Sequence, residues 1–433
     1  MQLNPVHLST EDADFASRLD ALTAWESVSD AARQQRVAEI IHEVRTRGDN
    51  ALVALTAELD KYAVADAQDL VLEPDALKSA FDELDPELQA ALVTAKERIW
   101  AFHEAQRESS WRLPEQDAGI VLGQEVRPMQ RVGLYVPGGL ATYPSSVLMN
   151  ALPAKVAGVP FVQMVVPAPE GVLNPVVLAA AYLAGVDRVI TIGGAQAIAA
   201  LAYGTDTVTP VDKIVGPGNA WVATAKRQVF GKVGIDMIAG PSEILVYVEP
   251  PMDPDWVAMD LFSQAEHDES AQPVLVASDR AFIGQVIESM NRLVMGLERS
   301  DIITTSINTR CIVIEARDRE DALDVINRIA PEHLELCVDD PESLLPAIQH
   351  AGAIFMGRYT PEALGDYCAG PNHVLPTSGT ARFASPLGVY DFVKRSSVIH
   401  CSAEGARRIA PVASTLAVSE GLTAHARSAD YRR

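Results

Sequence analysis

The chain has 433 residues, of which 48% are hydrophobic and 21% are charged, and its formal net charge is −23. This composition is typical of a globular protein. The length predicts two main domains with smaller pieces, because one hydrophobic core rarely organises so long a chain. The acidic balance argues against nucleic acid and anionic membrane surfaces as partners, since both select basic patches.

The cysteines and the apolar stretches favour a reducing, cytoplasmic location. The four cysteines are widely spaced and form no Cys-x-x-Cys pair, so neither a disulfide framework nor a thiolate zinc site is predicted. The first residues show no basic segment followed by an apolar one, so no secretory signal is expected. The most apolar long stretch, 172–186, is too short to span a bilayer.

The first third of the chain is mainly helical in pattern. Residues 1–26 are polar without a long period, and we expect an arm that packs elsewhere. From residue 27 the apolar residues follow a helical period, which predicts three helices and then short β-type runs between 119 and 134. The apolar faces of the three helices are assigned to the core: Val37, Ile40, Ile41 and Val44; Leu52, Leu55 and Leu59; and Leu88, Leu92, Ile99 and Phe102.

Apolar strands alternate with helices from residue 135 to 240, which predicts a parallel sheet covered on both faces. Glycine-rich loops follow three strands, at 137–139, 193–196 and 216–219. Ligands of such sheets bind beyond the carboxyl ends of the strands, where glycine permits close approach and helix N-termini favour phosphate. None of the loops has the G-x-G-x-x-G pattern, so glycines that merely close short turns are the alternative interpretation.

A second α/β sheet is predicted after residue 242. Its strands are expected at 244–248, 274–277, 310–314, 334–338 and 353–356, and its helices after Asp253, at 281–297, at 320–329 and around 344–350. No sequence repeat relates it to the first sheet. From about residue 388 the chain reads as a short mixed tail.

Gln264 and His267 are three residues apart at the end of a predicted helix, for which Asp253 is the N-cap and Pro254 the first residue. Positions i and i+3 share a helix face, so an amide oxygen and an imidazole would point the same way. This is half of a divalent-metal site, because zinc accepts both ligand types. A polar helix end in water is the alternative.

Three further groups combine acids and imidazoles. Glu332 and His333 follow Pro331 at a possible helix start, and adjacent acid and imidazole can supply a general base; a capping glutamate beside an incidental histidine is the alternative. Asp366 lies in a Gly/Pro-rich loop, where a turn-stabilising aspartate is the commoner use. Glu420 and His425 lie near the C-terminus. Cys368 has no base partner in the sequence and is assigned no chemistry.

Five segments taken together resemble histidinol dehydrogenases, over essentially the whole chain from about residue 25 to His425. The segments are Ile235-Asp236-x-x-Ala239-Gly-Pro-Ser242-Glu, Asp260-Leu-x-Ser-Gln264-Ala-Glu-His267, Ala330-Pro-Glu332-His333-Leu-Glu, Gly365-Asp366-Tyr-x-Ala-Gly-Pro-Asn-His373-Val-Leu-Pro-Thr and Glu420-Gly-Leu-Thr-Ala-His425. No position that carries the chemistry of that family departs from its pattern.

The resemblance implies a set of site residues. One zinc ion per subunit is expected on Gln264, His267, Asp366 and His425, with His425 coming from the partner subunit. Substrate contacts are expected from Ser242, His333 and Glu420 in addition to the metal ligands, and NAD contacts from Tyr135, Gln196 and Asn219. Each of these last three lies at or beside a glycine-rich loop.

The resemblance also implies an architecture and a reaction. Two Rossmann-like parallel-sheet domains are expected: an NAD domain (135–241) inserted into a zinc and substrate domain (27–134 and 242–387). Small end pieces (1–26 and 388–433) would make a homodimer with a shared active site. L-Histidinol would be oxidised through L-histidinaldehyde to L-histidine, with two hydrides passed to NAD, in the last steps of histidine biosynthesis. His333 suits removal of the alcohol proton, and Glu332 activation of the water that hydrates the aldehyde.

Three other functions stay open. A relative with the same fold could oxidise another small alcohol, such as a sulfonated diol. A zinc hydrolase would use a metal-bound hydroxide, but it needs no nucleotide loops and the chain has no His-Glu-x-x-His pattern. A non-catalytic ligand-binding protein would not need the Glu332 and His333 pair.

Overall fold

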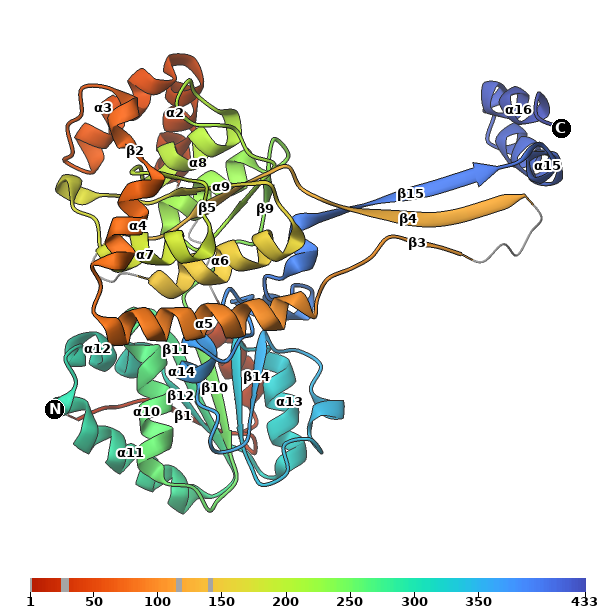
Figure 1. The fold of residues 1–433 in the computed structure, drawn as a ribbon. Helices are drawn as coiled ribbons and strands as arrows, with labels where there is room; N and C mark the ends of the chain where they lie inside the picture. Colours follow the sequence, from red (N-terminus) through yellow and green to blue (C-terminus); the bar gives the residue numbers. More distant parts are fainter. Residues whose placement is uncertain (1, 25–30, 114–118, 139–142) are drawn as a thin grey trace.

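Two six-stranded sheets, each covered by helices, and a long antiparallel arm make up the protein (Figure 1). The computed structural model describes residues 2–24, 31–113, 119–138 and 143–433. The predicted class, α/β with two parallel-sheet domains, is confirmed. Among the described residues, no helix is long and apolar enough to cross a membrane.

The first sheet, called sheet A, is parallel throughout and has buried central strands. Its order is β1 (Val6–Ser9), β12 (Ile312–Glu315), β11 (Gln272–Ala277), β10 (Glu243–Val248), β13 (His333–Cys337) and β14 (Ala353–Met356). Its helices are α1 (Phe15–Thr23), α10 (Pro254–Ala265), α11 (Arg280–Leu293), α12 (Ser300–Arg310), α13 (Arg319–Ile329) and α14 (Glu362–Tyr367). Every residue of β10, β11 and β13 is buried, as expected where helices cover both faces.

The second sheet, called sheet B, is parallel except at one edge. Its order is β2 (Val71–Leu72), β7 (Arg188–Ile190), β6 (Phe161–Val165), β5 (Arg131–Tyr135), β8 (Lys213–Val215) and β9 (Gly234–Ile235), and β2 is antiparallel to β7. Its helices are α2 (Ala31–Arg47), α3 (Asp49–Leu59), α4 (Pro74–Asp82), α6 (Pro144–Ala157), α7 (Pro175–Ala184), α8 (Gly194–Tyr203) and α9 (Ala220–Val229). The long helix α5 (Pro86–Glu104) lies between the two bodies in Figure 1.

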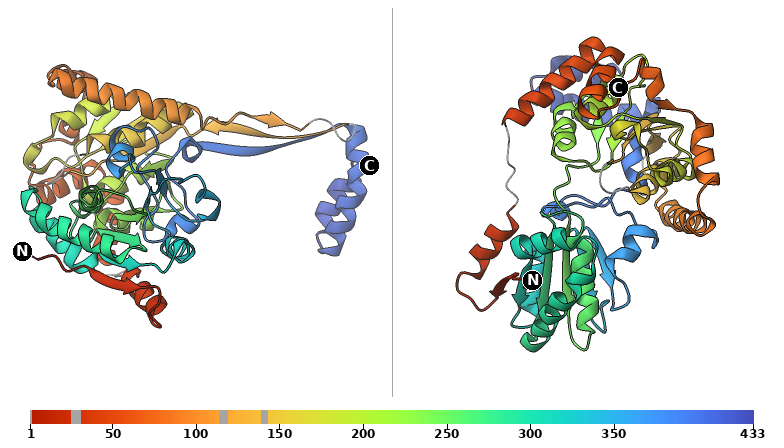
Figure 2. Two further views of the ribbon diagram at one scale, coloured as in Figure 1. Left: turned by 90° about the horizontal axis from the view of Figure 1, so that it is seen from below. Right: turned by 90° about the vertical axis from the view of Figure 1, so that its left-hand side faces the viewer.

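The arm leaves the two bodies and ends in a helical pair. Strands β3 (Trp111–Arg112), β4 (Ile120–Pro128) and β15 (Val393–Cys401) form an antiparallel sheet, followed by α15 (Ala403–Ser419) and α16 (Thr423–Asp430). Figures 1 and 2 show these two helices far from both sheets. The tail that the sequence left as short and mixed therefore contains a nine-residue strand and two helices.

The division of the chain between the sheets differs from the expected domain boundaries. Strand β1 pairs with β12, so Val6–Ser9 of the expected N-terminal arm form an edge strand of sheet A. The segment 27–134 was expected with 242–387, but within it Val71 pairs with Ile190 of β7, and Leu52 shares a core with Ile198 of α8, which covers sheet B. A helical period shows which face is apolar but not which sheet covers it.

One predicted helix is not formed, and one helix in the structure was not predicted. The segment 344–350 contains only the short 3-10 turn η4 (Leu345–Ala347), while α12 (Ser300–Arg310) was not predicted at all. Polar and β-branched residues fill much of α12, so its sequence has a weak helical signal, and packing of Ile303 and Ile307 in the core of sheet A stabilises it.

Candidate active site

The predicted site residues from 242 to 373 converge at the amino edge of sheet A. Glu243 is the first residue of β10 and His333 the first of β13, and these two strands are neighbours. Helix α10 runs back to this edge and brings Gln264, while α14 carries Asp366. The edge faces sheet B, because the Oγ of Ser146 on α6 lies 3.4 Å from the Nε2 of His373.

Gln264 and His267 are brought together by a turn and not by a shared helix face. Helix α10 begins as predicted, with the Asp253 carboxylate accepting from the Asp255 N–H, but it ends at Ala265. His267 lies beyond it, with its N–H bonded to the Gln264 carbonyl at 3.1 Å. The predicted helix thus ends before His267, although the bond from its N–H to the Gln264 carbonyl keeps the two residues one turn apart.

The Gln264 amide is completely buried and its orientation follows from its neighbours. The position of its nitrogen lies 2.9 Å from the Glu243 carbonyl oxygen and 3.1 Å from both Glu362 Oε1 and His333 Nδ1. Carbonyl and carboxylate oxygens accept hydrogen bonds, so the NH2 group points toward them. The amide oxygen is therefore left for a ligand, as a metal-binding glutamine requires.

His333 has one ring nitrogen engaged and one free. Its Nδ1 lies 2.9 Å from the Glu243 carbonyl oxygen, a pure acceptor, so Nδ1 donates and keeps its proton. Nε2 has no hydrogen-bond partner in the part of the chain that the structure describes and lies 3.6 Å from Asp366 Oδ1. Proton exchange at this imidazole therefore takes place at Nε2.

The local carboxylates decide the ionisation of His333. Burial by itself lowers the pKa of this imidazole, but Glu362, Glu332 and Asp366 outweigh burial and raise that pKa well above its usual value. The predicted helix start at Pro331 is wrong: α13 ends at Ile329, Ala330 takes a left-handed φ of 54°, and His333 opens a strand. The chain reverses direction at Ala330, and this reversal places Glu332 and His333 at the amino edge of sheet A.

Glu332 and Glu362 are two buried carboxyl groups beside this imidazole. Desolvation raises the pKa of each to about 8. Glu332 Oε2 accepts the Glu243 N–H at 2.8 Å and lies 3.8 Å from His333 Nδ1. Sequence reasoning missed Glu362, because a single glutamate at the start of a six-residue helix has no pattern that marks it as buried.

Three ligand-type side chains gather around a point that a metal could occupy. His267, Glu362 and Asp366 each offer a ligand atom, and these atoms lie within 4.8 Å of one another. Burial lowers the pKa of His267, which keeps its imidazole neutral as metal binding requires. Burial would raise the pKa of Asp366, but the nearby imidazoles of His333, His373 and His267 lower it. Neutral imidazole beside ionised carboxylate fits zinc.

The remaining predicted residues of this set are divided between the amino edge of sheet A and the arm. Ser242 is half-buried next to Glu243, and its carbonyl oxygen accepts the Gln272 N–H at 2.9 Å, so it belongs to the same edge. Glu420 and His425 are exposed on the distant helical pair of the arm. Within a single chain they do not meet the other residues.

The predicted nucleotide residues share the carboxyl edge of sheet B. Tyr135 ends β5, its hydroxyl accepts the Gly194 N–H at 3.2 Å, and burial raises the pKa of this phenol to about 12. Gln196 is 1% exposed, and its Oε1 has no hydrogen-bond partner among the described residues. Asn219 caps α9 through bonds to the N–H groups of Trp221 and Val222. Gly139, in the first glycine-rich loop, lies outside the described residues.

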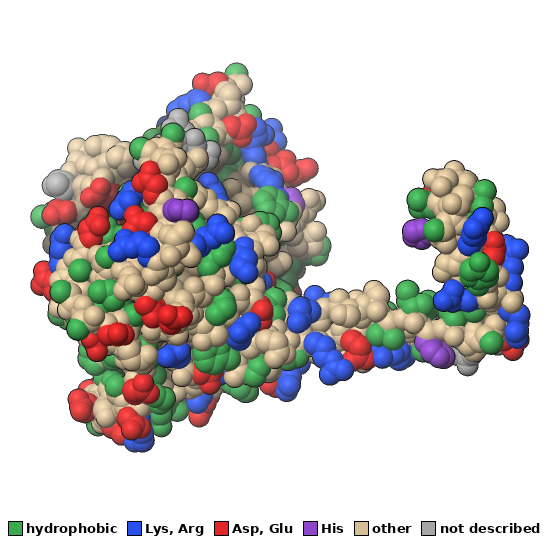
Figure 3. Space-filling model, turned by 90° about the horizontal axis from the view of Figure 1, so that it is seen from above, with side chains coloured by type: hydrophobic (Ala, Val, Ile, Leu, Met, Phe, Trp, Pro, Cys, Tyr) green, Lys and Arg blue, Asp and Glu red, His purple; other side chains and the backbone are tan. Residues whose placement is uncertain are grey.

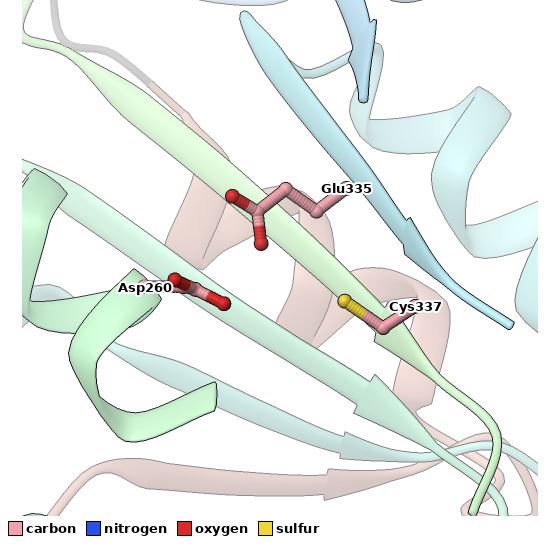
Figure 4. Close-up of side chains that lie close together, drawn as sticks. All are labelled: Asp260, Glu335 and Cys337. Atoms are coloured by element: carbon pink, nitrogen blue, oxygen red, sulfur yellow. The ribbon is translucent and has the colours of Figure 1, made fainter. Parts of the chain in front are cut away.

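A second carboxyl cluster lies behind the site. Asp260 of α10 faces Glu335 and Cys337 of β13, with ligand-type atoms within 4.8 Å of one another (Figure 4). Glu335 Oε1 accepts the Glu362 N–H at 2.6 Å. Because residues two apart on a strand share a face, Glu335 stands beside His333 and holds the first residue of α14.

Two facing edges therefore define a class of protein: an α/β protein whose glycine-rich nucleotide-type loops face a buried centre of imidazole and carboxyl groups. Residues 24–433 match the family model described as Histidinol dehydrogenase, and the chain belongs to the histidinol dehydrogenase family.

Individual proteins of known name are similar over nearly their full length. The protein named histidinol dehydrogenase from Pseudomonas aeruginosa is 63% identical over 425 residues, which cover 98% of this chain and 96% of that one. That of Methylococcus capsulatus is 62% identical, with 98% and 97% covered. The crystal structure of histidinol dehydrogenase from Elizabethkingia anophelis superposes with a TM-score of 0.93 at 31% identity, covering 100% of this chain and 98% of that one.

Proposed function

We propose that the protein oxidises L-histidinol through L-histidinaldehyde to L-histidine, with NAD as hydride acceptor and one zinc ion per subunit, in the last steps of histidine biosynthesis. The observation that carries this proposal is the free Nε2 of buried His333, which stands beside a zinc-type ligand set at an edge facing sheet B. The family membership supports the choice of substrate.

The metal would be held by Gln264, His267 and Asp366, with His425 of a second copy as the fourth protein ligand. When bound, zinc orients the substrate and holds it between the two oxidations. Glu362 supports this set by accepting from the Gln264 amide, which keeps the amide oxygen directed at the ion. Ser242 and Glu420 are proposed to contact the substrate.

His333 is proposed to remove the alcohol proton through Nε2 in its neutral form, because Nδ1 is already bonded to the Glu243 carbonyl. The raised pKa of this imidazole means that the neutral form, and with it the proton transfer, is favoured as pH rises. The aldehyde must then gain water before a second hydride can leave, and Glu332 is proposed to activate that water. The pKa of the Glu332 carboxyl group is about 8, so its carboxylate form is a stronger base than an ordinary carboxylate and can take a proton from water more readily.

The NAD would bind at the carboxyl edge of sheet B, with contacts from Tyr135, Gln196 and Asn219. Burial of the Gln196 amide oxygen without a partner supports this position, since a buried acceptor normally has a donor. The nicotinamide would then face the amino edge of sheet A, where the substrate lies.

The arm is proposed to pair two copies into a homodimer. Helices α15 and α16 stand away from both sheets (Figure 1), and they expose several large apolar side chains on the projecting end of the molecule (Figure 3). The exposed apolar residues of the pair and of the strand before it are Ile399, Ile409, Val412, Leu416, Val418 and Leu422. Burial of this surface against a second copy would carry Glu420 and His425 to that copy's site.

The first measurement is NADH formation from L-histidinol by the purified protein, before and after chelator treatment and again after zinc is restored. Two NADH for each histidinol, lost with chelator and recovered with zinc, are expected. Absence of NADH from folded, zinc-loaded protein would refute histidinol as the substrate, and a sulfonated diol or another small alcohol, the alternative with this fold, would be screened next.

Two variants separate the proposed roles. Gln264→Ala should weaken zinc and histidinol binding together, because it removes an oxygen ligand of the ion that holds the substrate. His333→Ala should lower turnover while zinc content, measured by metal analysis, stays at the wild-type level. If both hydride transfers continued in His333→Ala, the assignment of the base would be wrong.

Subunit mixing tests the shared site. His333→Ala and His425→Ala are each expected to be nearly inactive alone. If the site is shared, each mixed dimer contains one intact site, and an equal mixture refolded together should recover about a quarter of wild-type activity. No recovery from a mixture shown to contain mixed dimers would mean that both residues act within one chain.

A further inference from the structure

We propose that Lys226 and Asp236 are positioning residues that fix the loop 216–219 to the chain crossing between the sheets, and so set the NAD relative to the substrate. This inference rests on the proposed function, since it assumes that NAD binds at this loop. The two residues are outside the set implied by the family resemblance.

The two side chains form a buried ion pair around one glycine. Lys226 lies on α9 and Asp236 directly follows β9, and their side chains are 4% and 1% exposed. Asp236 Oδ2 accepts the Gly216 N–H at 2.7 Å, while Lys226 Nζ donates to the Gly216 carbonyl oxygen at 3.0 Å. The second carboxylate oxygen of Asp236 accepts from Lys226 Nζ. Both main-chain polar groups of Gly216 are therefore bonded to one ion pair.

Gly216 lies directly against the backbone of Tyr135, another residue of the proposed nucleotide site. Its φ is +112°, and a Cβ placed on it would lie 2.1 Å from the Tyr135 carbonyl oxygen. The loop continues to Asn219, which caps α9, and α9 carries Lys226. Tyr135, the loop and α9 thus form one rigid unit that the ion pair closes.

Asp236 also marks the place where the chain leaves sheet B for sheet A. Its N–H is bonded to the Ile214 carbonyl of β8 at 3.2 Å, and residues 237–242 then lead to Glu243 at the head of β10. Along this crossover, the Gly240 N–H bonds to Thr377 Oγ1 at 2.6 Å. The crossover is thus held at both ends, by Asp236 at the nucleotide loop and by Glu243 beside His333.

The physical chemistry of a buried ion pair favours a positioning role over a purely stabilising one. Removing two charges from water costs several kcal/mol per ion, and well-packed apolar residues often stabilise a fold equally well. What apolar side chains cannot do is bind an N–H and a C=O of the same glycine at once. We infer that the pair specifies the loop geometry.

The test is to measure NADH binding by the zinc-loaded Asp236→Ala variant and by the zinc-loaded wild type in a fluorescence titration. Loss of a charge-assisted bond to the loop should raise the Kd for NADH about 10-fold to 100-fold. Binding of histidinol and zinc should stay at wild-type values. Asp236→Asn keeps an acceptor for the Gly216 N–H and should recover most of the lost affinity. An apolar side chain of similar size would not recover it.

Sheet B offers a second ion pair at its opposite edge as a control for position. The Lys155 and Asp187 side chains form an ion pair at 2.6 Å, and Asp187 Oδ2 also accepts the Val162 N–H at 2.8 Å. This pair likewise joins a lysine, an aspartate and a main-chain N–H, but its side chains are 18% and 36% exposed and it lies at the amino ends of β6 and β7. Asp187→Ala should leave the Kd for NADH unchanged.

The outcomes separate the inference from the function on which it rests. If the wild-type protein neither binds NADH nor reduces NAD with histidinol, the proposed function fails. If the wild type binds NADH and Asp236→Ala binds it equally well, or if Asp187→Ala loses as much affinity, the positioning role is overturned. If thermal unfolding shows that Asp236→Ala is not folded, the double variant Lys226→Met/Asp236→Asn is used in its place, because it leaves neither charge of the ion pair buried. It retains an acceptor for the Gly216 N–H but loses the bond to the Gly216 carbonyl, so weaker NADH binding is still expected and unchanged binding refutes the inference.

Discussion

Replacing Glu335 tests how the buried carboxyl cluster supports the site. Glu335 is 1% exposed, and its Oε1 accepts the Glu362 N–H at 2.6 Å while its other oxygen faces Asp260. In Glu335→Ala the Glu362 N–H is left buried without an acceptor. Glu335→Gln keeps the acceptor and directs an NH2 group at Asp260.

The magnitudes of the two changes should differ clearly. An unsatisfied buried N–H costs about 1–3 kcal/mol. The cavity left by a fully buried side chain adds roughly 1–2 kcal/mol. Glu335→Ala should therefore lower the free energy of unfolding by about 2–5 kcal/mol, and Glu335→Gln by less than about 1 kcal/mol.

The pH dependence of the difference gives an independent check. Burial raises the pKa of Asp260 to about 6 and that of Glu335 well above its usual value. The folded protein thus binds more protons than the unfolded chain, so this pair's contribution to stability is largest in acid and falls as pH rises through about 6. In Glu335→Gln one of these groups is absent and Asp260 gains a donor, so the variant should become more stable relative to wild type between pH 5 and pH 8.

Urea unfolding of the zinc-free proteins at equal concentration, at several pH values, measures both effects. Equal destabilisation by alanine and glutamine would show that the bond to Glu362 is not what Glu335 contributes. A difference between Glu335→Gln and wild type that does not change with pH would refute the ionisation argument.

Three further changes probe other parts of the molecule. Gly216→Ala should weaken NADH binding in a titration, because φ is +112° and the new methyl group would meet the Tyr135 carbonyl; unchanged affinity would contradict the close approach. His103→Gln should reduce the acid sensitivity of unfolding relative to wild type. Burial lowers the pKa of His103, so its contribution is complete above pH 6.5, the unfolded value, and is lost as pH falls toward the folded pKa; replacement of the exposed His400 serves as control. Leu416→Glu, at a side chain 58% exposed on α15, should shift the protein toward monomer in sedimentation and lower activity with it, and a monomeric wild type would refute the proposed dimer.

The sequence pointed to several residues of the candidate site, partly through local chemistry and partly through the family resemblance. Gln264, His267, His333 and Asp366 stand in motifs whose residue types are unusual for their surroundings, and the structure brings them to one edge of sheet A. The alternation of apolar strands and helices likewise predicted two parallel sheets, because a strand buried on both faces must be apolar throughout.

Tertiary structure decided what a linear pattern does not contain. Glu362, the Lys226 and Asp236 pair and the Glu335 anchor become visible only when distant segments pack, since charged residues in a sequence normally indicate solvent. Packing also assigned the early helices to sheet B and stopped α10 before His267. A sequence determines which surfaces must be buried and which groups can react, but burial and distance, which set their pKa values and partners, depend on how the segments meet in space.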